Sequence, residues 1–584
     1  MAVEKLIVDH IDTWTTALQT RSTAGRGSSG KIELYGIKKL HELILELAVR
    51  GKLVPQDPND EPASELLKHI AAEKAELVKQ GKIKKPKPLP EISEEEKPFE
   101  LPAGWEWIKI SEIGHDWGQK TPDEDFTYID VGSINKEYGI IEEPSILSAK
   151  DAPSRARKIV QKGTVIYSTV RPYLLNIAII ESAFSPEPIA STAFAIIHPY
   201  TAMNANFIYY YLRSPVFINY VESCQTGVAY PAINDKQFFS GIIAVPPSSE
   251  QARITKKIKE LMSLCDQLEQ HSLTSLDAHQ QLVETLLTTL TDSQNADELT
   301  ENWARISEHF DTLFTTEPSI EALKQTILQL AVMGKLVPQD PNDEPASELL
   351  KRIAQEKAQL VKDGKIKKQK PLPPISDEEK PFELPDGWEW CLFEDVVDIQ
   401  SGITKGRNLA NRKLISIPYL RVANVQRGYL DLSEVKEIDI PEEEKDKYHV
   451  IKGDLLITEG GDWDTVGRTT VWCHDWYIAN QNHVFKGRVI GQDIDPYWLE
   501  TYMNSPYSRD YFASASKQTT NLASINKTQL RGCPVAIPPS SEAEKIMLKL
   551  NDFNELCEKL KLQIQSAQQT QLHLADALTD AAIN

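Results

Sequence analysis

One stretch of this sequence occurs twice, and this repeat constrains the fold more than any other feature. The letters GKLVPQDPNDEPASELLK run from Gly51 to Lys68 and return unchanged from Gly334 to Lys351. The match extends without a gap from 37–107 to 320–390, at a shift of 334 − 51 = 283 residues. Solenoid repeats have periods of about 20 to 50 residues, so this period is far too long for one. The chain is therefore a duplicated module.

A second pair of matching segments follows at a slightly longer shift. Ile233-Asn234 with PPSSE at 246–250 recurs as Ile525-Asn526 with PPSSE at 538–542, and 538 − 246 = 292. Between the matching frames lie two inserts, about 108–232 and 391–524, that are only faintly alike. This order predicts a helical frame with an extended arm, a first insert, a central helical frame, a second insert and a final helix, at 1–107, 108–245, 246–390, 391–537 and 538–584.

Composition limits the class of protein. With 584 residues, 41% of them hydrophobic, the chain can bury several cores, and its length predicts about three to four domains. A net charge of −21 argues against indiscriminate binding to a polyanion, so any nucleic-acid contact must be local or shared with a partner. We find no apolar run near the roughly 18 residues of a membrane span. The six cysteines are widely spaced without a CxxC pair, so we expect no zinc site, no disulfide framework and a reducing cytoplasm.

A long helix is predicted after each insert. Two prolines forbid helix before Ser248, a serine can cap the first turn, and Glu250 lies near the positive end of the helix dipole, so the helix should begin near Ser249. Apolar residues then follow a 4-3 spacing typical of a coiled-coil seam. They are Ile254, Ile258, Leu261, Cys265 and Leu268 in one copy and Ile546, Leu550, Phe553, Cys557, Leu560, Ile564 and Ala567 in the other.

Two such helices in matching register favour one arrangement. Each is expected to span about 40 residues, or about 60 Å. Each offers a seam that the other can fill, so we expect an antiparallel coiled coil with a pseudo-two-fold axis that holds the inserts apart. The alternative is that each helix is an ordinary amphipathic core element.

The frame ahead of each insert has further helical and extended parts. Apolar spacing predicts a helix around 37–48, repeated at 320–331, and another helix from about Ala63 to Gln80. A basic, proline-rich arm follows at 82–90 and should lie extended over a surface. Such an arm is a linker, or it is kept in both copies because a partner or a DNA duplex contacts it.

The inserts share an apolar skeleton and differ in polar residues. The segments 128–134 and 419–425 both alternate like half-buried strands, and 162–169 parallels 452–459 as a turn and a buried strand with polar groups at its end. We therefore predict an α+β multidomain protein with two mixed α/β inserts between long helices.

A shared fold with altered polar edges is what two readers of different DNA targets should show. Arginine can bond guanine through two hydrogen bonds, asparagine or glutamine can do so with adenine, and carboxylates can accept from cytosine. Basic runs occur in both inserts, at Arg155, Arg157, Lys158 and Lys162 and at Lys405, Arg407, Arg412 and Lys413. Polar loops at 226–230 and 518–521 suit close approach of the backbone to a ligand. Solvated faces and ordinary loops are the alternatives.

Signatures of catalysis are missing. The GxGxxG at 25–30 follows a helical segment in a Ser/Gly-rich stretch, which indicates a flexible linker and not a dinucleotide site. The sequence has no Walker A loop and no Asn/Asp-Pro-Pro-aromatic motif of amino-methyltransferases. His483 is a single histidine, for which a structural role is the first interpretation. Catalysis, if any, belongs to a partner.

Two variable inserts in duplicated helical frames, with KGDLLITEGG at 452–461, Gln481-Asn482-His483 and the Ile-Asn and Pro-Pro junctions ahead of each long helix, resemble the specificity subunits of type I restriction-modification systems. The resemblance covers essentially the whole chain. The frame of about 100 residues before the first insert is similar to one subgroup and departs from members whose first insert begins near the N-terminus.

The resemblance implies a function and partners. Each insert would be a target recognition domain that reads one half of an asymmetric, bipartite sequence in double-stranded DNA. Two copies of a modification subunit would dock on the frame and methylate adenine with S-adenosylmethionine, and restriction subunits would use ATP and Mg to translocate and cleave DNA. The chain itself would be non-catalytic, would bind no cofactor or metal, and would contact no membrane.

Strand ends and loops supply the expected DNA contacts. In the first insert we predict Arg155, Arg157, Ser168, Thr169, Arg171, Tyr173 and Tyr230. In the second we predict Arg421, Asn424, Glu459, Asp462, Trp463, Arg468, Asn482, Thr520 and Asn521. Two other classes stay open, a two-headed scaffold that binds proteins and a stand-alone enzyme with a hidden active site.

Overall fold

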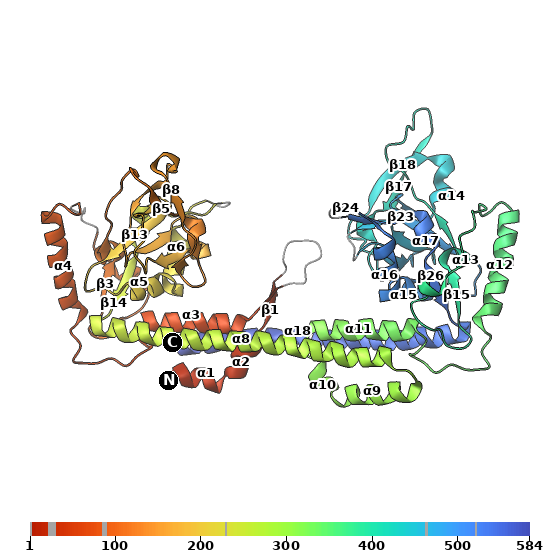
Figure 1. Cartoon of the computed structure of the whole chain (residues 1–584), viewed down its shortest axis with the longest axis horizontal. Coiled ribbons are helices and arrows are strands. Elements are labelled where there is room, and N and C mark those ends of the chain that lie inside the picture. The colour runs from red at the N-terminus through yellow and green to blue at the C-terminus, as the bar shows by residue number, and fades with distance from the viewer. Residues whose placement is uncertain (1–2, 22–30, 85–89, 228–229, 462–464, 520–521) are drawn as a thin grey trace. The chain divides into compact units, whose positions relative to one another are not determined.

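The computed structural model describes residues 3–21, 31–84, 90–227, 230–461, 465–519 and 522–584 (Figure 1). The chain forms two compact units. The first consists of 1–24, 29–274 and 567–584, and the second of 25–28 and 275–566. Each unit therefore holds one insert together with helices from distant parts of the sequence.

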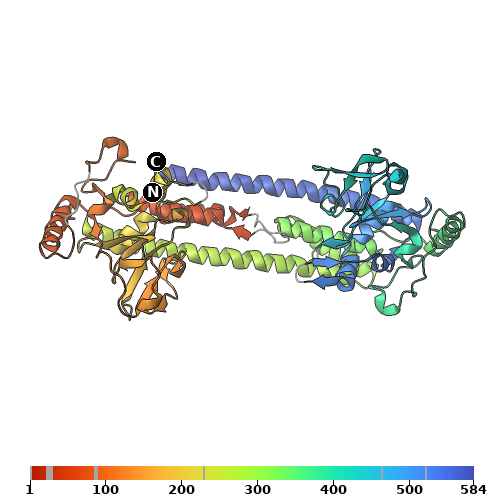
Figure 2. The same ribbon diagram turned by 90° about the horizontal axis from the view of Figure 1, so that it is seen from above.

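Helices of the first unit come from both ends of the chain. The N-terminal region forms α1 (Val3–Asp9), α2 (Ile11–Thr16), the hairpin β1 (Gln19–Arg21) with β2 (Lys31–Glu33), α3 (Tyr35–Val49) and α4 (Ala63–Lys79). The long helices α8 (Ser248–Asp292) and α18 (Ser540–Ile583) contribute one end each. Within this unit α3 lies between them (Figure 2), and the Tyr35 hydroxyl donates to Asp576 Oδ1 at 2.8 Å.

The second unit repeats this arrangement with different residues. It contains α9 (Ala296–Glu308), α10 (Phe310–Leu313), α11 (Glu317–Val332) and α12 (Ala346–Lys362), with the other ends of α8 and α18. Here α11 lies between the long helices, and Lys324 Nζ donates to Glu558 Oε1 at 2.9 Å (Figure 2). Burial of Leu287, Ile327 and Leu550 in one apolar cluster joins the three helices.

The predicted start of the long helices is confirmed within one residue, but the predicted seam is buried only in part. Ile254, Ile258, Leu261 and Cys265 of α8 are buried, and burial resumes at Val283, Leu287 and Leu290. Ala567 of α18, predicted in the seam, is exposed. The reason is that α3 and α11, of 15 and 16 residues, fill the seam and are far shorter than the 45 and 44 residues of the long helices.

A buried glutamate fixes the first turn of each long helix. The indole Nε1 of Trp105 donates to Glu250 Oε2 at 3.0 Å, and Gln56 Nε2 donates to Glu250 Oε1 at 2.8 Å. The second copy repeats both bonds, from Trp388 and Gln339 to Glu542, at 3.1 Å each. Burial raises the pKa of both glutamates above the ordinary value. In the first copy these bonds connect the repeated turn, through Gln56, and the border of the insert, through Trp105, to the first turn of α8.

Each insert begins and ends in two paired strands of the frame. Strand β3 (Glu106–Lys109) pairs antiparallel with β14 (Ile242–Val245), and β15 (Glu389–Leu392) pairs in the same way with β26 (Pro534–Ile537). The two termini of each insert therefore lie side by side.

The first insert contains two four-stranded sheets. Their strand orders are β11-β10-β13-β4, all antiparallel, and β8-β5-β12-β9, in which β5 and β12 run parallel. The bounds are β4 (Gly114–His115), β5 (Phe126–Ile129), β6 (Ile134–Asn135), β7 (Ile140–Ile141), β8 (Ser145–Leu147), β9 (Ala156–Ile159), β10 (Val165–Ser168), β11 (Ile177–Ile179), β12 (Pro188–Ser191), β13 (Phe194–Pro199), α5 (Ala205–Leu212), α6 (Pro215–Cys224) and α7 (Asp235–Ser240).

The second insert repeats this topology. Its sheets have the orders β21-β19-β23-β16 and β18-β17-β22, and a small sheet β20-β25-β24 is added. The bounds are α13 (Phe393–Val396), β16 (Val397–Gln400), β17 (Leu414–Leu420), β18 (Lys436–Pro441), α14 (Lys445–Tyr448), β19 (Leu455–Thr458), β20 (Gly460–Gly461), β21 (Thr469–Val471), β22 (Ala479–Asn480), β23 (Val484–Val489), α15 (Pro496–Met503), α16 (Pro506–Ala515), β24 (Lys517–Thr519), β25 (Leu522–Ser524) and α17 (Lys527–Arg531).

Two details differ from the sequence-based expectation for these strands. All four residues of β5 are buried, so this strand is covered on both faces instead of alternating. The segments 131–133 and 422–424 form single 3₁₀ turns in place of continued strand. The side chain of Asp130 accepts from Ser133 N and caps the first turn, and that cap ends the strand. The buried strands predicted within 162–169 and 452–459 are present as β10 and β19.

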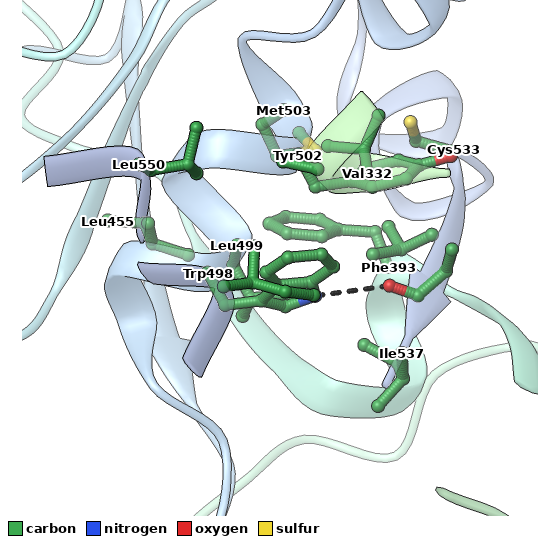
Figure 3. Close-up of a cluster of buried hydrophobic side chains, with 14 of the residues drawn as sticks. Val332, Phe393, Leu455, Trp498, Leu499, Tyr502, Met503, Cys533, Ile537 and Leu550 are labelled. Atoms are coloured by element: carbon green, nitrogen blue, oxygen red, sulfur yellow. Dashed lines mark hydrogen bonds between the residues drawn. The ribbon is translucent and has the colours of Figure 1, made fainter. Parts of the chain in front are cut away.

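The second insert shares a core with its helical frame. Figure 3 shows Val332 of α11, Leu455 of β19, Trp498 of α15 and Leu550 of α18 in one cluster of buried side chains. The Trp498 Nε1 donates to Ala536 O at 3.1 Å, which satisfies the polar atom of the indole. In the described part of the chain, no helix is both long and apolar enough to cross a bilayer.

Candidate nucleic-acid interface

The end of β10 and the end of β19 have the same backbone arrangement. Thr169 N donates to Ala193 O and Ile233 N donates to Thr169 O, at 2.9 and 3.0 Å. In the second insert Glu459 N donates to His483 O and Ile525 N donates to Glu459 O, both at 2.9 Å. Thr169 and Glu459 are therefore equivalent positions, as are Ala193 and His483. Three separate chain segments meet at each of these strand ends.

In the first insert this strand end carries an exposed cluster of arginine and tyrosine. Arg171 follows β10 with a left-handed φ of +50°, and its backbone N donates to Pro231 O at 2.8 Å. Its guanidinium carbon lies 4.9 Å from the centre of the Tyr230 ring. Tyr230 and Tyr173 are 70% and 50% exposed. A strained arginine over an open aromatic ring offers both a charge and a stacking surface to a ligand.

Ser168 and Thr169 differ from the expectation that they face outward. Their side chains are buried, and their hydroxyls donate to Val170 O and Ala193 O, each at 2.9 Å. The chain turns outward only after them, at Val170, which is 39% exposed. Both residues hold the loop that presents Arg171.

The predicted basic run of the first insert is split by the fold. Arg155 is exposed, Arg157 on β9 is half-buried, and Lys162 is exposed. Lys158 is buried and its Nζ lies 3.0 Å from Asp235 Oδ2. Arg155, Arg157 and Lys162 thus reach the surface, whereas Lys158 is buried in an ion pair with Asp235.

A carboxylate and an imidazole occupy the equivalent strand end of the second insert. His483 Nδ1 lies 2.5 Å from Glu459 Oε2, and His483 is the more exposed of the pair. Arg468, at the start of the strand that pairs with β19, donates from Nη1 to Gln426 Oε1 at 2.7 Å. Asn482 is half-buried and its backbone N donates to Ile403 O at 2.9 Å. This edge therefore carries both hydrogen-bond acceptors and donors.

Arg421 and Asn424 share a 3₁₀ turn instead of a strand face. Asn424 is buried, and its amide nitrogen donates to Asp431 O and Glu434 O at 2.8 and 3.0 Å, which differs from the expectation that it faces a ligand. Arg421 Nη2 donates to Glu434 Oε2 at 2.9 Å. Hydrogen bonds from Arg421 and then Lys436 hold the pKa of Glu434 below its ordinary value.

The basic run of the second insert is largely neutralised. Arg407 and Arg412 both contact Glu444, at 2.7 and 3.1 Å, and Lys413 Nζ lies 2.6 Å from Glu442 Oε2. Lys405 Nζ lies 5.1 Å from the centre of the Tyr419 ring. Sequence neighbours did not indicate these pairs, because the carboxylates come from a segment about 30 residues away.

Four predicted contacts, Asp462, Trp463, Thr520 and Asn521, lie outside the described residues. Two residues that the sequence analysis did not predict as DNA contacts lie next to predicted contact residues. They are Gln426, the partner of Arg468, and His483, for which a structural role was the first interpretation. The Gln-Asn-His triplet was a usable signal for His483, whereas nothing local marks Gln426. Among the described residues no group of three His, Cys, Asp or Glu could hold a metal ion.

Comparison with known proteins agrees with this geometry. The model of the type I restriction modification DNA specificity domain matches residues 102–278 and 385–567. The chain is 50% identical to the specificity subunits of the type I restriction enzymes EcoEI and EcoAI of Escherichia coli, over the full length of every chain. The crystal structure of the HsdS subunit from Thermoanaerobacter tengcongensis is 20% identical with a TM-score of 0.42, over 83% of this chain and 98% of that one. That weak likeness adds nothing to the assignment.

The chain belongs to the family of type I restriction-modification DNA specificity proteins. It is a specificity subunit, which recognises DNA and leaves catalysis to other subunits of the complex. The resemblance deduced from its repeats is thereby confirmed.

Proposed function

We propose that residues 108–245 and 391–537 are target recognition domains that read different halves of one asymmetric, split DNA sequence. The observation that carries this proposal is the pair of equivalent strand ends. Their backbone hydrogen bonds coincide while the side chains change from Thr169 and Ala193 to Glu459 and His483. A half-buried carboxylate such as Glu459 can accept from cytosine, and an exposed arginine such as Arg171 can bond guanine, so the two ends suit different bases.

Direct contacts are assigned to side chains that reach the surface. In the first domain these are Arg155, Arg157, Arg171, Tyr173 and Tyr230, and in the second they are Arg421, Glu459, Arg468 and Asn482, with His483 and Gln426 added. Ser168, Thr169 and Asn424 position these residues from inside the domain. Asp462, Trp463, Thr520 and Asn521 remain proposed contacts on the basis of sequence.

The helical frame is proposed to space the two domains. Helix α8 begins in the first unit and ends in the second, whereas α18 begins in the second and ends in the first. The two helices therefore pass through the two units in opposite order, which supports an antiparallel frame with the pseudo-two-fold axis inferred from the duplication. In this frame α3 and α11 fill the seams, where the duplication suggested direct contact of the long helices in a coiled coil. The frame regions 1–107, 246–390 and 538–584 would keep the half-sites at a fixed spacing.

Partners follow from the duplicated frame. Two near-identical surfaces would dock two copies of the modification subunit, which methylates the N6 atom of adenine with S-adenosylmethionine. Because that adenine is stacked inside the duplex, the modification subunit must flip it out while this chain fixes the register. Restriction subunits would add ATP- and Mg-dependent translocation and cleavage. Because all of these reactions would act on DNA inside the cell, we expect the complex in the cytoplasm.

Methylation mapping with an exchanged domain tests the proposal. The chain is expressed with its neighbouring modification subunit, either unchanged or with residues 391–537 replaced by a second copy of 108–245, and methyladenine is mapped across the genome. We expect one asymmetric split motif for the natural chain and a symmetric motif, built from its first half, for the exchanged chain. An unchanged motif would contradict the domain assignment. No motif beside an active modification subunit would favour a protein-binding scaffold.

A further inference from the structure

Each unit contains an open cleft between the arm-bearing helix of the frame and the border of its insert. In the first unit, the cleft of about 560 Å³ lies between α4 and β3 and is lined by Leu67, Ile70, Ala71, Lys74, Ala75, Val78, Ile108 and Glu112. In the second unit, a larger cleft of about 1150 Å³ lies between α12, the arm at 366–374 and β15, with Leu350, Ala354, Lys357, Ala358, Val361, Cys391 and Asp395 at corresponding places. The two clefts are a duplicated feature.

The apolar wall of each cleft is left open by the fold. In α12 the buried residues are Ala346, Leu349 and Ile353, all in the first half of the helix. Ala354 and Ala358 lie on the cleft side and are exposed. The same division holds in α4, where Ala71 and Ala75 are exposed. An amphipathic helix normally buries such a stripe against a neighbour, so the second half of each helix has room for a further apolar element.

One ion pair crosses each cleft. Lys74 Nζ lies 2.8 Å from Glu112 Oε2, and Lys357 Nζ lies 4.0 Å from Asp395 Oδ1. These pairs link helix and insert at corresponding positions, and Arg531 Nη2 attaches the arm by donating to Lys370 O at 2.7 Å. The cleft is therefore formed by contacts within the folded unit, and the arm at its edge is attached to the insert.

The rim of the second cleft is strongly basic. Lys362, Lys367, Lys368, Lys370 and Lys527 line it, and none of them makes an ion pair with a described residue. Burial lowers the pKa of Lys527, Asp398 opposes this shift, and Arg531 and Lys367 add to it. Four carboxylates also line the cleft, at Glu389, Glu394, Asp395 and Asp398. Glu394 is paired with Arg531 and Asp395 with Lys357, so the unpaired lysines leave the lining with an excess of positive charge. In a chain of net charge −21 such a rim favours an acidic occupant.

We propose that each cleft docks an acidic, amphipathic segment of the subunit that binds this chain in two copies, which in the proposed function is the modification subunit. The apolar floor argues for a polypeptide, because a DNA backbone presents no apolar face. The likeness of the two clefts argues for one partner used twice, because the recognition domains beside them differ. The inference rests on the proposed function and assigns a docking point to it.

Substitutions on the open wall test the docking. Ala71→Glu and Ala354→Glu place a negative charge in the first and second cleft, where it would repel an acidic segment and lose its water. Ala72→Glu and Gln355→Glu change exposed neighbours that do not line the clefts, and they serve as controls. The full chain is mixed with its neighbouring modification subunit, and light scattering with chromatography gives the number of copies bound.

The expected outcome is a stepwise loss of copies. The natural chain and both controls bind two copies, each single cleft variant binds one copy with the other weakened about ten-fold or more, and the double variant binds neither well. A second variant, Lys367→Glu with Lys368→Glu on the exposed arm, avoids any question of folding. It should weaken only the second copy and reduce the salt dependence of its binding.

Three results would overturn the proposal. Cleft variants that assemble like the natural chain would show that the segment docks elsewhere. Full assembly with weaker binding to every DNA sequence would identify the duplex as the occupant, and self-association lost in the variants would identify a second copy of this chain. In all three cases a sequence-specific natural complex leaves the proposed function intact. Failure of the natural chain to bind the modification subunit would remove both.

Discussion

The ends of β10 and β19 have nearly the same backbone and almost nothing else in common. One presents Arg171 over Tyr230, and the other presents Glu459 against His483. The bonds that fix both ends join backbone atoms, such as Ile233 N to Thr169 O and Ile525 N to Glu459 O. Because these bonds do not depend on the side chains, polar side chains at these two strand ends can be substituted without loss of the local backbone structure. The frames, in contrast, are held by side chains such as Glu250 and Glu542, and their sequences are repeated.

The largest expected difference between the inserts lies beneath these ends. Lys486 of β23 is buried where β13 has Ile196, since the two residues face Leu456 and Ile166 in the same register. Burial lowers the pKa of Lys486 to about 8. At Lys486 the folded state therefore binds fewer protons than the unfolded state above about pH 8, so the contribution of this residue to stability should rise toward pH 10.5 by up to about 3 kcal/mol.

The substitution Lys486→Ile should remove this rise. The measurement is the free energy of unfolding in urea at about pH 7 and about pH 10, for the natural chain and the variant. Ile196→Lys is the mirror experiment in the first insert, and it should create an alkaline rise where none is expected. Equal pH dependence in all three chains would show that Lys486 keeps its ordinary pKa.

Exchange of the strand-end residues should separate the half-sites. Glu459→Thr removes the half-buried carboxylate, so we expect discrimination at one base pair of the second half-site to fall by about 1 to 3 kcal/mol, or roughly 5 to 150-fold. Competition binding of the complex with oligonucleotides substituted in either half measures this. Arg171→Ala is the matched variant for the first half-site, because Arg171 is the exposed polar residue at that strand end. A uniform loss over both halves would mean that Glu459 positions the domain and does not read bases.

A smaller effect is expected at the aromatic ring below Arg171. Tyr230→Leu removes the ring that faces the guanidinium, an interaction of about 0.5 to 1 kcal/mol at exposed sites, so binding should weaken roughly 2 to 5-fold. Tyr230→Phe keeps the ring and should bind like the natural chain. If Tyr230→Phe is as weak as Tyr230→Leu, the hydroxyl and not the ring makes the contact.

The smallest difference concerns two lysines of the basic runs. Lys162 is exposed without an ion pair to a described residue, whereas Lys413 is paired with Glu442. Lys162→Ala should lower the slope of log affinity against log salt by about 0.9, the value for one phosphate contact. Lys413→Ala should leave the slope unchanged, and an equal change in both variants would contradict the role given to Glu442.

Features set by local chemistry were predictable from the sequence. The proline pair and the serines mark the start of α8 within one residue, and the second helix of the frame ends at Lys79 where Gln80 was expected. The repeat exposed the two-unit organisation because it needs no knowledge of packing. Chain turns and helix caps depend on neighbouring residues only, which is why they can be predicted from the sequence.

Features set by distant residues were not predictable. The segment 128–134 alternates in sequence, but β8 and β12 flank β5 and all its residues are buried. Ser168 and Asn424 are polar residues in plausible places, yet both point inward, where their side chains donate to Val170 O and Asp431 O. The sheets that cover them come from more distant parts of the chain. The neutral second basic run depends on Glu444, which the sequence places far from Arg407. Pairing across tens of residues leaves no local pattern.

The pairing of β3 with β14, and of β15 with β26, has an evolutionary consequence. Since each insert enters and leaves the frame through adjacent strands, a foreign insert of any internal design can join the frame with its two ends already in place. The same frame residues precede both inserts, at 37–107 and 320–390, and the same PPSSE motif follows both, so one insert can be exchanged while the other is kept. New specificities can therefore arise by shuffling whole modules, with no intermediate in which the frame must refold.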